Sequence, residues 1–195
     1  VLPFRPTTRL TLGLNTESHP RPQQGLQSGI LEMDGKSALR GRKLLLMGSA
    51  FYREKALPPA VKSTIDEAIA RKMKIIVGEA HGASRSFQDY LKSKGYRNVV
   101  VGHAMRIRYN AGDWKTKQYG QDLQERERRM IEDCDSAIVM WVDQSSVIAE
   151  DLERLKRLGK PTLLYEYSNK TKISKIGPLD PKRIYSLGYY IWHRK

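Results

Sequence analysis

The stretch Lys43-Leu-Leu-Leu-Met-Gly-Ser49 decides the fold, because it predicts a short buried strand that stops at a glycine. A continuous apolar run of this length is typical of a strand that is covered on both faces. Four similar runs follow it along the chain, at 73–77, 98–101, 137–142 and 161–165. None approaches the roughly 18 apolar residues of a membrane helix, so we expect no membrane span.

Apolar residues at helical spacing separate the five predicted strands. Val61 and Ile65 lie four residues apart after Pro58 and Pro59, which suit the first turn of a helix. Comparable patterns predict helices over 58–71, 85–93, about 122–134 and 146–158. Strands that alternate with helices of this length specify a parallel sheet with right-handed crossovers. We therefore predict an α/β fold, a doubly wound, Rossmann-like parallel sheet, over residues 43–167.

The flanking segments, 1–42 and 168–195, are predicted to be extended basic arms. Prolines and glycines interrupt the first of them, and it lacks a periodic apolar pattern. The second includes the aromatic run 183–192, which predicts an added edge strand whose rings pack on the core or stack on bases. The chain carries a net charge of +14, and the two arms hold +9 of it. This charge favours a polyanionic partner that the arms contact.

Composition narrows the class of protein. The chain has 195 residues, of which 39% are hydrophobic and 29% charged, which suits one globular domain. Its single cysteine, Cys134, excludes a disulfide framework or a multi-cysteine zinc site within these residues. Asp133 and Asp135 flank this cysteine and are expected to raise the pKa of its thiol. These features fit a cytoplasmic protein or one from another reducing compartment.

Three loops follow predicted strands and enter helices, which is where open parallel sheets bind ligands. They are Gly48-Ser-Ala-Phe-Tyr-Arg53, Gly78-Glu-Ala-His-Gly-Ala-Ser84 and Asp143-Gln-Ser-Ser146. Small residues at a helix start leave backbone N–H groups open to an anion, and Ser84 and one of Ser145 and Ser146 are expected to cap the helices. The predicted ligand-binding residues are Gly48, Ser49, Arg53, Gly78, Gly82, Ala83, Ser84, Ser145 and Ser146. Their expected ligand is a nucleotide or a related phosphate compound, although neither the GxGxxG motif nor the Walker lysine motif is present.

A series of short motifs runs through the predicted domain. It comprises Gly48-Ser49, Leu57-Pro-Pro-Ala-Val61, Ile75-Ile-Val-Gly-Glu-Ala-His-Gly-Ala83, Phe87-Gln88, Tyr90-Leu91, Gly95-Tyr96, Asn98-Val99, Met130, Ala137-Ile-Val-Met-Trp141 and Ser145. In this order the motifs resemble the SLOG superfamily of Rossmann-like proteins, which includes the lysine-decarboxylase-like LOG proteins and the DNA-processing protein A family. The resemblance covers about 43–165 and is nearest to small bacterial and phage members. It implies binding of a nucleotide or nucleotide derivative and, for some members, cleavage of an N-glycosidic bond.

The sequence departs from the family pattern at the closest ligand contacts. The arginine expected after Gly-Ser is Ala50, and the aspartate that ends the second loop is Ser84. The Gly-Thr pair of the last loop falls on Val147 and Ile148, whose β-branched side chains obstruct close approach of the backbone to a phosphate. We therefore expect a partly eroded nucleotide pocket.

Two acidic residues are candidates for catalysis. Glu79 could act as nucleophile or general base at a glycosidic carbon, with Glu150 as the second carboxylate. The alternative is that Glu79 caps a turn and that Glu150 pairs with Arg154, four residues further along the helix. Binding without catalysis is the favoured hypothesis, and hydrolysis of a nucleotide N-glycosidic bond is the alternative. His81 and His103 do not form a metal motif, so no metal and no further cofactor are predicted.

Basic residues outside the three loops predict contacts with nucleic acid. They are Arg106, Arg108, Lys115, Lys117, Arg194 and Lys195. Lysine and arginine contacts with phosphates make binding steeply dependent on salt. The sequence leaves open an acidic protein partner, a purely structural place in a nucleoprotein or virion assembly, and a homo-oligomer. The alternating charges of 125–129 instead predict a solvated helix face.

Overall fold

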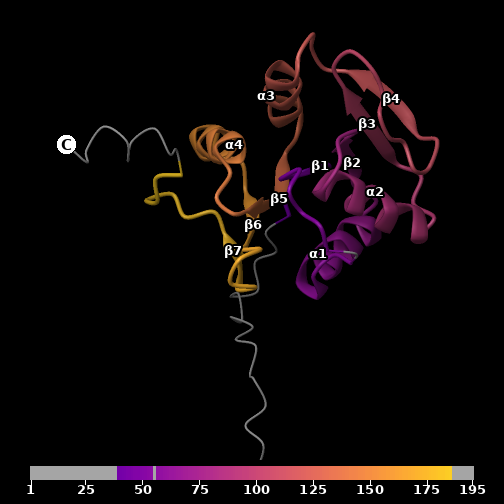
Figure 1. Ribbon diagram of the computed structural model, residues 1–195. Helices are drawn as coiled ribbons and strands as arrows, with labels where there is room; N and C mark the ends of the chain where they lie inside the picture. Colours follow the sequence, from indigo (N-terminus) through magenta and orange to yellow (C-terminus); the bar gives the residue numbers. More distant parts are fainter. Residues whose placement is uncertain (1–38, 55, 186–195) are drawn as a thin grey trace, which may run out of the picture. The chain divides into compact units, whose positions relative to one another are not determined.

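The computed structural model describes residues 39–54 and 56–185, which form seven strands and four helices (Figure 1). The strands make one sheet in the order β4-β3-β2-β1-β5-β6-β7. From edge to edge they are β4 (Lys115–Gln118), β3 (Val99–His103), β2 (Lys74–Gly78), β1 (Lys43–Gly48), β5 (Ser136–Val142), β6 (Thr162–Tyr167) and β7 (Ser174–Pro178). All neighbours are parallel except β6 and β7. The predicted doubly wound, Rossmann-like α/β fold is confirmed.

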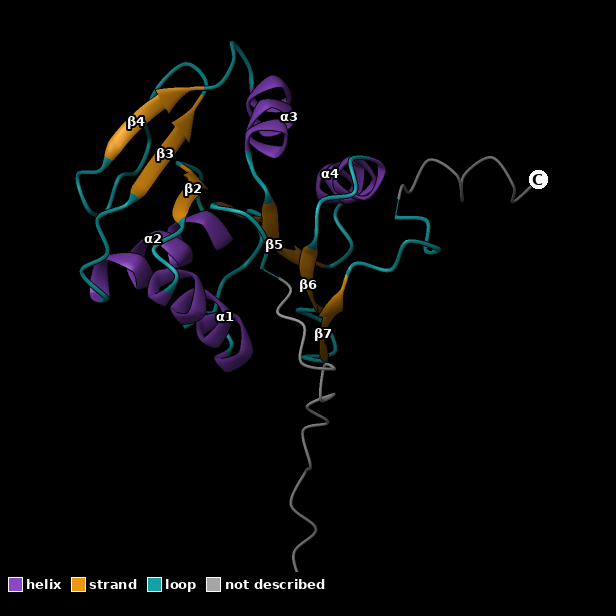
Figure 2. Ribbon diagram, turned by 180° about the vertical axis from the view of Figure 1, so that it is seen from behind, coloured by secondary structure: helices purple, strands orange, loops and turns teal. Residues whose placement is uncertain are grey.

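Two helices cover each face of the sheet (Figure 2). α1 (Pro59–Ala70) and α2 (Ala83–Ser93) pack on one face, and α3 (Leu123–Asp133) and α4 (Ser146–Arg157) pack on the other. Leu44 and Leu46 of β1 join the core under α1 and α2, while Leu45 and Met47 join the core under α3 and α4. The continuous apolar run of β1 is therefore explained by burial on both faces. No helix in the described part of the chain is long and apolar enough to cross a membrane.

The sequence pattern does not predict β4. Its four residues, Lys115-Thr-Lys-Gln118, are polar and exposed, and Lys115 lies opposite Val100 of β3 in parallel register. The connection from β3 contains no helix in the described structure. Lysines on an edge strand oppose pairing with another chain, which suits the position of β4 at the end of the sheet.

The sheet also continues beyond Tyr167, where the sequence pattern ends the domain. β7 pairs antiparallel with β6, with Leu164 opposite Gly177. An added edge strand therefore lies at 174–178, and the described part of the predicted strand, residues 183–185, does not belong to the sheet. Tyr185 packs on the core instead, with its ring centroid 5.7 Å from that of Trp141. The rest of the predicted aromatic strand, and the first arm up to residue 38, lie outside the described residues.

The N-caps of α2 and α4, the helices that begin at two of the predicted ligand loops, differ from what the sequence predicts. The N-cap of α2 is Gly82, with φ at +74°, so Ser84 lies inside the helix and does not cap it. Ser145 is the N-cap of α4 as predicted, yet its side chain makes no capping hydrogen bond. Both hydroxyl groups are therefore left for other contacts at this edge of the sheet.

Candidate functional site

The chain adds strands first on one side of β1 and then on the other, and this reversal marks the expected position of a ligand. From β1 the chain adds β2, β3 and β4 on one side, and it then returns to place β5 on the other side. The reversal leaves a crevice at the carboxyl ends of β1 and β5. Open parallel sheets bind their ligands in this position.

A pocket of about 400 Å³ lies at this crevice, and we call it the switch-point pocket. Its volume falls within the range of small-molecule sites. Its lining comes from the ends of β1 and β2 with the loops behind them, from the β3–β4 connection, from α3 and from the start of α4. The polar and charged lining residues are Ser49, His81, Ser84, Arg108, Gln124, Arg126, Glu127 and Ser145.

An ion-pair cluster of Glu79, Arg108 and Arg126 adjoins the pocket. Glu79 is 1% exposed, and one carboxylate oxygen accepts a hydrogen bond from Arg126 while the other accepts one from Nη2 of Arg108 at 3.0 Å. Both arginines line the pocket, whereas Glu79 does not. Two guanidinium groups thus share the Glu79 carboxylate, and Arg126 also pairs with Glu127 of the pocket lining, so both arginines are held in place by carboxylates.

Two buried polar atoms of the pocket lack a hydrogen-bond partner within the described residues, Nε of Arg126 and Oγ of Ser145. The Arg126 side chain is 4% exposed, and its Nη2 donates to Glu127 at 2.8 Å. Leaving a buried donor unpaired costs about 1–3 kcal/mol, so an acceptor bound here is stabilised. A phosphate oxygen is well matched to a guanidinium N–H and a hydroxyl.

Backbone donors and a further hydroxyl open on the same edge. The first-turn N–H groups of α2 and α4 have no intrahelical acceptor, and the positive end of each helix dipole favours an anion. Ser49 lines the pocket and is held by its backbone, because its N–H donates to the Met140 carbonyl at 2.9 Å. Its Oγ accepts from the N–H of Phe51 at 3.2 Å, which leaves the hydroxyl proton to donate.

Gly48 and Gly82 are needed for packing. A Cβ on Gly48 would lie 2.7 Å from the Met140 carbonyl oxygen and 2.9 Å from the Cβ of Ala83. A Cβ on Gly82, whose φ is positive, would lie 2.6 Å from backbone atoms of Ala50. These two glycines therefore let β1, β5 and α2 approach one another closely.

Gly78 has a different environment. The nearest atoms to a Cβ there are Oγ of Ser84 at 3.4 Å and Cζ of Arg126 at 3.8 Å, which are ordinary contact distances. A methyl group would fit the fold, and it would occupy space between two pocket side chains. Gly78 is thus the glycine whose absent side chain keeps room for a ligand.

The structure brings five of the nine predicted ligand-binding residues to the pocket, namely Gly48, Ser49, Gly78, Ser84 and Ser145. The other four lie outside its lining: Arg53 and Ser146 are exposed, Ala83 is buried in the core, and Gly82 packs against Ala50. Of the two residues expected to obstruct a phosphate, Val147 is exposed at the rim and Ile148 is buried in the core under α4.

The two predicted catalytic acids do not share the pocket. Both oxygens of Glu79 accept hydrogen bonds from arginines, which occupy the lone pairs that a nucleophile or base uses. Glu150 is exposed and lines a separate hollow of about 280 Å³ between α3 and α4. No ion pair joins it to Arg154 within the described part of the chain. The geometry therefore does not pair Glu79 with Glu150 over one bond.

A different carboxyl group of α4, that of Asp151, is buried against α3. Burial and the neighbouring Glu127 raise the pKa of Asp151 to about 9. Asp151 therefore carries a proton at neutral pH and hydrogen-bonds to Glu127, which in turn accepts from Arg126. This pair links the packing of α3 on α4 to the pocket arginine.

Apolar side chains surround the polar part of the pocket. Phe51, Leu123 and Val147 line it and are 57%, 47% and 55% exposed. They come from the β1–α1 loop and from the starts of α3 and α4. Large apolar side chains beside a polar pocket suit the flat face of a ring.

The predicted nucleic-acid contacts fall in different places. Arg108 belongs to the ion-pair cluster, and Lys117 on β4 binds Asp133 at 2.9 Å. Arg106 and Lys115 are exposed, while Arg194 and Lys195 lie outside the described residues.

Cys134 is buried, and burial raises the pKa of its thiol to about 12. Asp135 and Asp133 add to this shift, as the sequence predicts, while Lys160 opposes it. A thiol in this state is not a nucleophile at neutral pH. Among residues 39–54 and 56–185, no group of three histidine, cysteine, aspartate or glutamate side chains is arranged to hold a metal ion.

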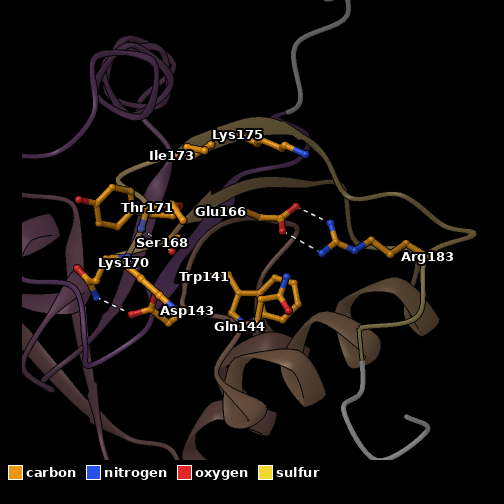
Figure 3. Close-up of a pocket in the computed structure, with 12 residues that line it drawn as sticks. Trp141, Asp143, Gln144, Glu166, Ser168, Lys170, Thr171, Ile173, Lys175 and Arg183 are labelled. Carbon is orange, nitrogen blue, oxygen red and sulfur yellow. Dashed lines mark hydrogen bonds and ion pairs between the residues drawn. The ribbon is translucent and has the colours of Figure 1, made fainter. Parts of the chain in front are cut away.

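A larger hollow of about 1030 Å³ lies beside β6 and β7 (Figure 3). Arg183 makes two hydrogen bonds to Glu166, at 2.5 and 2.9 Å, and Nδ2 of Asn169 donates to Asp143 at 2.8 Å. The guanidinium of Arg183 also lies 5.3 Å from the Trp141 ring centroid. Because these polar groups satisfy one another, this hollow offers a ligand less than the switch-point pocket does.

Arg126 is the residue that sequence reasoning misses. Segment 125–129 is predicted to be a solvated face, which is wrong for Arg126 but correct for Arg128 and Arg129, each about half exposed and facing Glu125. The signal lies in the spacing. Arg126 precedes Met130 by four residues and therefore shares the buried face of α3.

Comparison with known proteins gives no identity for the chain. No protein-family model matches it, and no curated protein matches it either. The expected relationship to the SLOG superfamily thus stays a prediction, and the function has to be argued from the site.

Proposed function

We propose that the protein binds a nucleotide or nucleotide derivative in the switch-point pocket, with a phosphate group against Arg126. The observation that carries this proposal is a buried arginine whose Nε–H has no partner among the described residues. A buried charged group with an unfilled donor is costly unless a ligand completes its hydrogen bonds. A phosphate supplies several acceptors at once.

Residues near Arg126 are placed to contact both the phosphate and the base of such a ligand. Arg108, Ser49 and Ser145 add donors at the phosphate end, together with the first turns of α2 and α4. The exposed ring of Phe51 at the rim gives a base or another flat ring a surface to stack on. Ala50 stands where the related proteins are expected to carry an arginine, so we expect modest affinity.

The test is a calorimetric titration of the full chain with AMP, ADP, ATP, adenosine and inorganic phosphate. Binding should require the phosphate group, so adenosine should bind at least about tenfold more weakly than the best nucleotide, which corresponds to about 1.4 kcal/mol. Gly78→Ala should weaken binding because its methyl group enters the pocket.

Gly177→Ala is the matched control, since a Cβ there meets no atom within 4 Å and the residue lies on the edge strand β7. It should bind as the wild type does. Absence of binding by every compound, or equal affinities for Gly78→Ala and Gly177→Ala, would contradict the proposal.

Hydrolysis of an N-glycosidic bond is the alternative activity. The two arginine hydrogen bonds to Glu79 support a structural role for this carboxylate more strongly than attack on a sugar carbon. Incubation with nucleoside monophosphates and chromatography for free base is the direct assay. Base release that is lost in Glu79→Gln would establish the enzyme, provided that the variant is folded.

We also propose that the basic arms hold the protein to nucleic acid through residues 1–38 and 186–195. A truncation that tests this must spare β7 and the buried Tyr185, so it removes 1–38 and 186–195. The truncated chain should be retained less on immobilised nucleic acid at low salt. Retention that does not depend on salt would count against this role.

A further inference from the structure

A second hollow, of about 380 Å³, lies at the amino ends of β1 and β2, opposite the carboxyl ends that form the switch-point pocket. Its lining residues are Gly41, Arg42, Lys43, Arg71, Lys72, Met73, Lys74 and Asn98. Five of these eight are arginine or lysine, and none is acidic. We call this feature the amino-edge hollow.

Three of the five cations have no ion-pair partner among the described residues. Lys43 binds Asp133 at 2.6 Å and Arg71 binds Glu67 at 3.3 Å, which leaves the side chains of Arg42, Lys72 and Lys74. These three groups converge on one hollow from the β1 and β2 ends of the sheet. Like charges placed together without partners repel one another, so the fold gains nothing electrostatically from this arrangement.

The nearest acid of this edge is already engaged by the backbone. Oδ2 of Asp135 accepts from the N–H of Arg42 at 2.7 Å and from the N–H of Lys43 at 2.9 Å. These bonds lower the pKa of Asp135 from its ordinary value, the Arg42 N–H having the largest effect. Asp135 thus orients the start of β1 and leaves the charge of the Arg42 side chain for an external anion.

Lys72 occupies a backbone position that favours glycine. Its φ is +55°, and it follows the last turn of α1, where its N–H donates to the Ile69 carbonyl at 2.9 Å. Gly95 and Gly159 occupy the same position after α2 and α4, with φ of +64° and +61°. α1 therefore carries a lysine where the two other helices carry glycine, and this lysine lines the hollow.

We propose that the amino-edge hollow docks the phosphate backbone of a nucleic acid. The row of cations continues along the sheet, since Arg97 stands just before β3 and Lys115 begins β4. Adjacent strands lie about 4.8 Å apart, so cations on successive strands can meet successive phosphates. Of the lining residues only Met73 is a large apolar one, and it is buried. A protein partner would need an apolar centre that this surface lacks, whereas a phosphate backbone needs only charge.

The experiment measures binding of a fluorescein-labelled single-stranded RNA to the full chain by anisotropy, between about 50 and 200 mM salt. Each lost phosphate contact should reduce the magnitude of the slope of log K against log salt by about 0.7. We expect this reduction for Lys72→Gly, and about three times as much for the triple variant Arg42→Gln, Lys72→Gly and Lys74→Gln.

Lys172→Gly is the matched control. Lys172 is an exposed lysine in the turn between β6 and β7, its φ is +59°, and it lies at the other edge of the sheet. The substitution removes the same charge and relieves the same backbone conformation, so it should leave the salt slope unchanged.

Equal slopes for the triple variant and Lys172→Gly would overturn the proposal. Labelled polyglutamate serves as the second probe. If it binds as tightly as the RNA and loses affinity equally in the triple variant, the hollow takes an acidic protein and the assignment to nucleic acid is wrong. Gly78→Ala should keep the RNA slope of the wild type, so failure at this hollow is separable from failure at the switch-point pocket.

Discussion

Gly48 and Gly78 end neighbouring strands, yet a methyl group would meet different surroundings at each. In Gly48→Ala the new Cβ lies 2.7 Å from the Met140 carbonyl oxygen, so β1 and β5 must separate. We expect the free energy of unfolding to fall by about 1–3 kcal/mol. In Gly78→Ala the nearest atom is 3.4 Å away, so stability should stay within about 0.5 kcal/mol of the wild type. Urea denaturation of both variants checks this, and equal stabilities would contradict the packing argument.

The substitution Lys72→Gly should change stability and RNA binding in opposite directions. Its left-handed backbone costs a residue with a Cβ about 1 kcal/mol, which glycine avoids while losing some entropy on folding. Lys72→Gly should therefore unfold with a free energy about 0.5–1 kcal/mol higher, even though it weakens RNA binding. Thermal and urea denaturation measure the gain, and Lys172→Gly should show a smaller one, because it also removes the ion pair with Glu54 and the contact with the Tyr167 ring. Loss of stability in both variants would show that neither lysine is strained.

At the scale of elements, the Arg126–Glu79 pair fastens α3 to the end of β2. Glu79→Gln removes one of the two carboxylates that pair with the buried Arg126 guanidinium, and breaking such a pair costs about 3–5 kcal/mol. We expect a loss of about 3 kcal/mol by urea denaturation, because Glu127 still pairs with Arg126 and glutamine still accepts one hydrogen bond. Adding Arg126→Met should recover part of this loss, since it removes the guanidinium that has lost a partner. A double variant that is less stable than Glu79→Gln would argue against this role of the pair.

The contact between α3 and α4 should make stability depend on pH. The pKa of Asp151 is raised to about 9, far above the roughly 3.9 of an unfolded aspartate. Between these values the folded state binds one more proton, so the free energy of unfolding falls as pH rises, by up to about 1.4 kcal/mol per pH unit. This stabilisation is complete below about pH 4 and is lost as pH rises through about 9.

Asp151→Asn replaces the protonated carboxyl group with a neutral one of the same shape. The variant should therefore gain stability relative to the wild type at each step from about pH 5 to about pH 8, as measured by urea denaturation. Glu132→Gln, at an exposed position of α3, should keep the pH dependence of the wild type. A pH dependence in Asp151→Asn that runs parallel to that of the wild type would contradict the assignment of this proton to Asp151.

The elements that were predictable from sequence are those buried on both faces. β1 and β5 are apolar after their first residues, Lys43 and Ser136, and stand out against any flanking loop. β4 and β7 each have one free edge and polar or breaker residues, so their pairing follows from the neighbouring strand and not from their own pattern. A sequence that is read locally therefore underestimates the width of the sheet.

The same physical reason explains which residues of the candidate site could be predicted from the sequence and which could not. Ser49 and Gly78 were predictable as pocket residues, because the carboxyl ends of parallel strands meet at one edge. Arg126 was not, because its burial depends on which face of α3 meets the sheet. Gly48 also shows that a residue predicted for ligand contact can owe its identity to the approach of two strands.

For the whole molecule, the parallel sheet separates the two surfaces that we propose bind phosphate groups. β1 and β2 each begin at the amino-edge hollow and end at the switch-point pocket, so a strand of six residues places them roughly 17 Å apart. The two surfaces share no lining residue. At physiological salt the Debye length is about 8 Å, so exposed charges at this separation are largely screened from each other.

The two surfaces should therefore act independently. Calorimetric titration of the full chain with a nucleotide should give the same affinity with and without saturating RNA, within about twofold. Lys72→Gly should bind the nucleotide as the wild type does, and the double variant with Gly78→Ala should show both single effects added together. A nucleotide affinity that falls sharply when RNA is bound would mean that both ligands compete for the same one of the two surfaces. Independent binding would instead make the sheet a rigid spacer that can hold a small phosphate ligand and a nucleic acid at the same time.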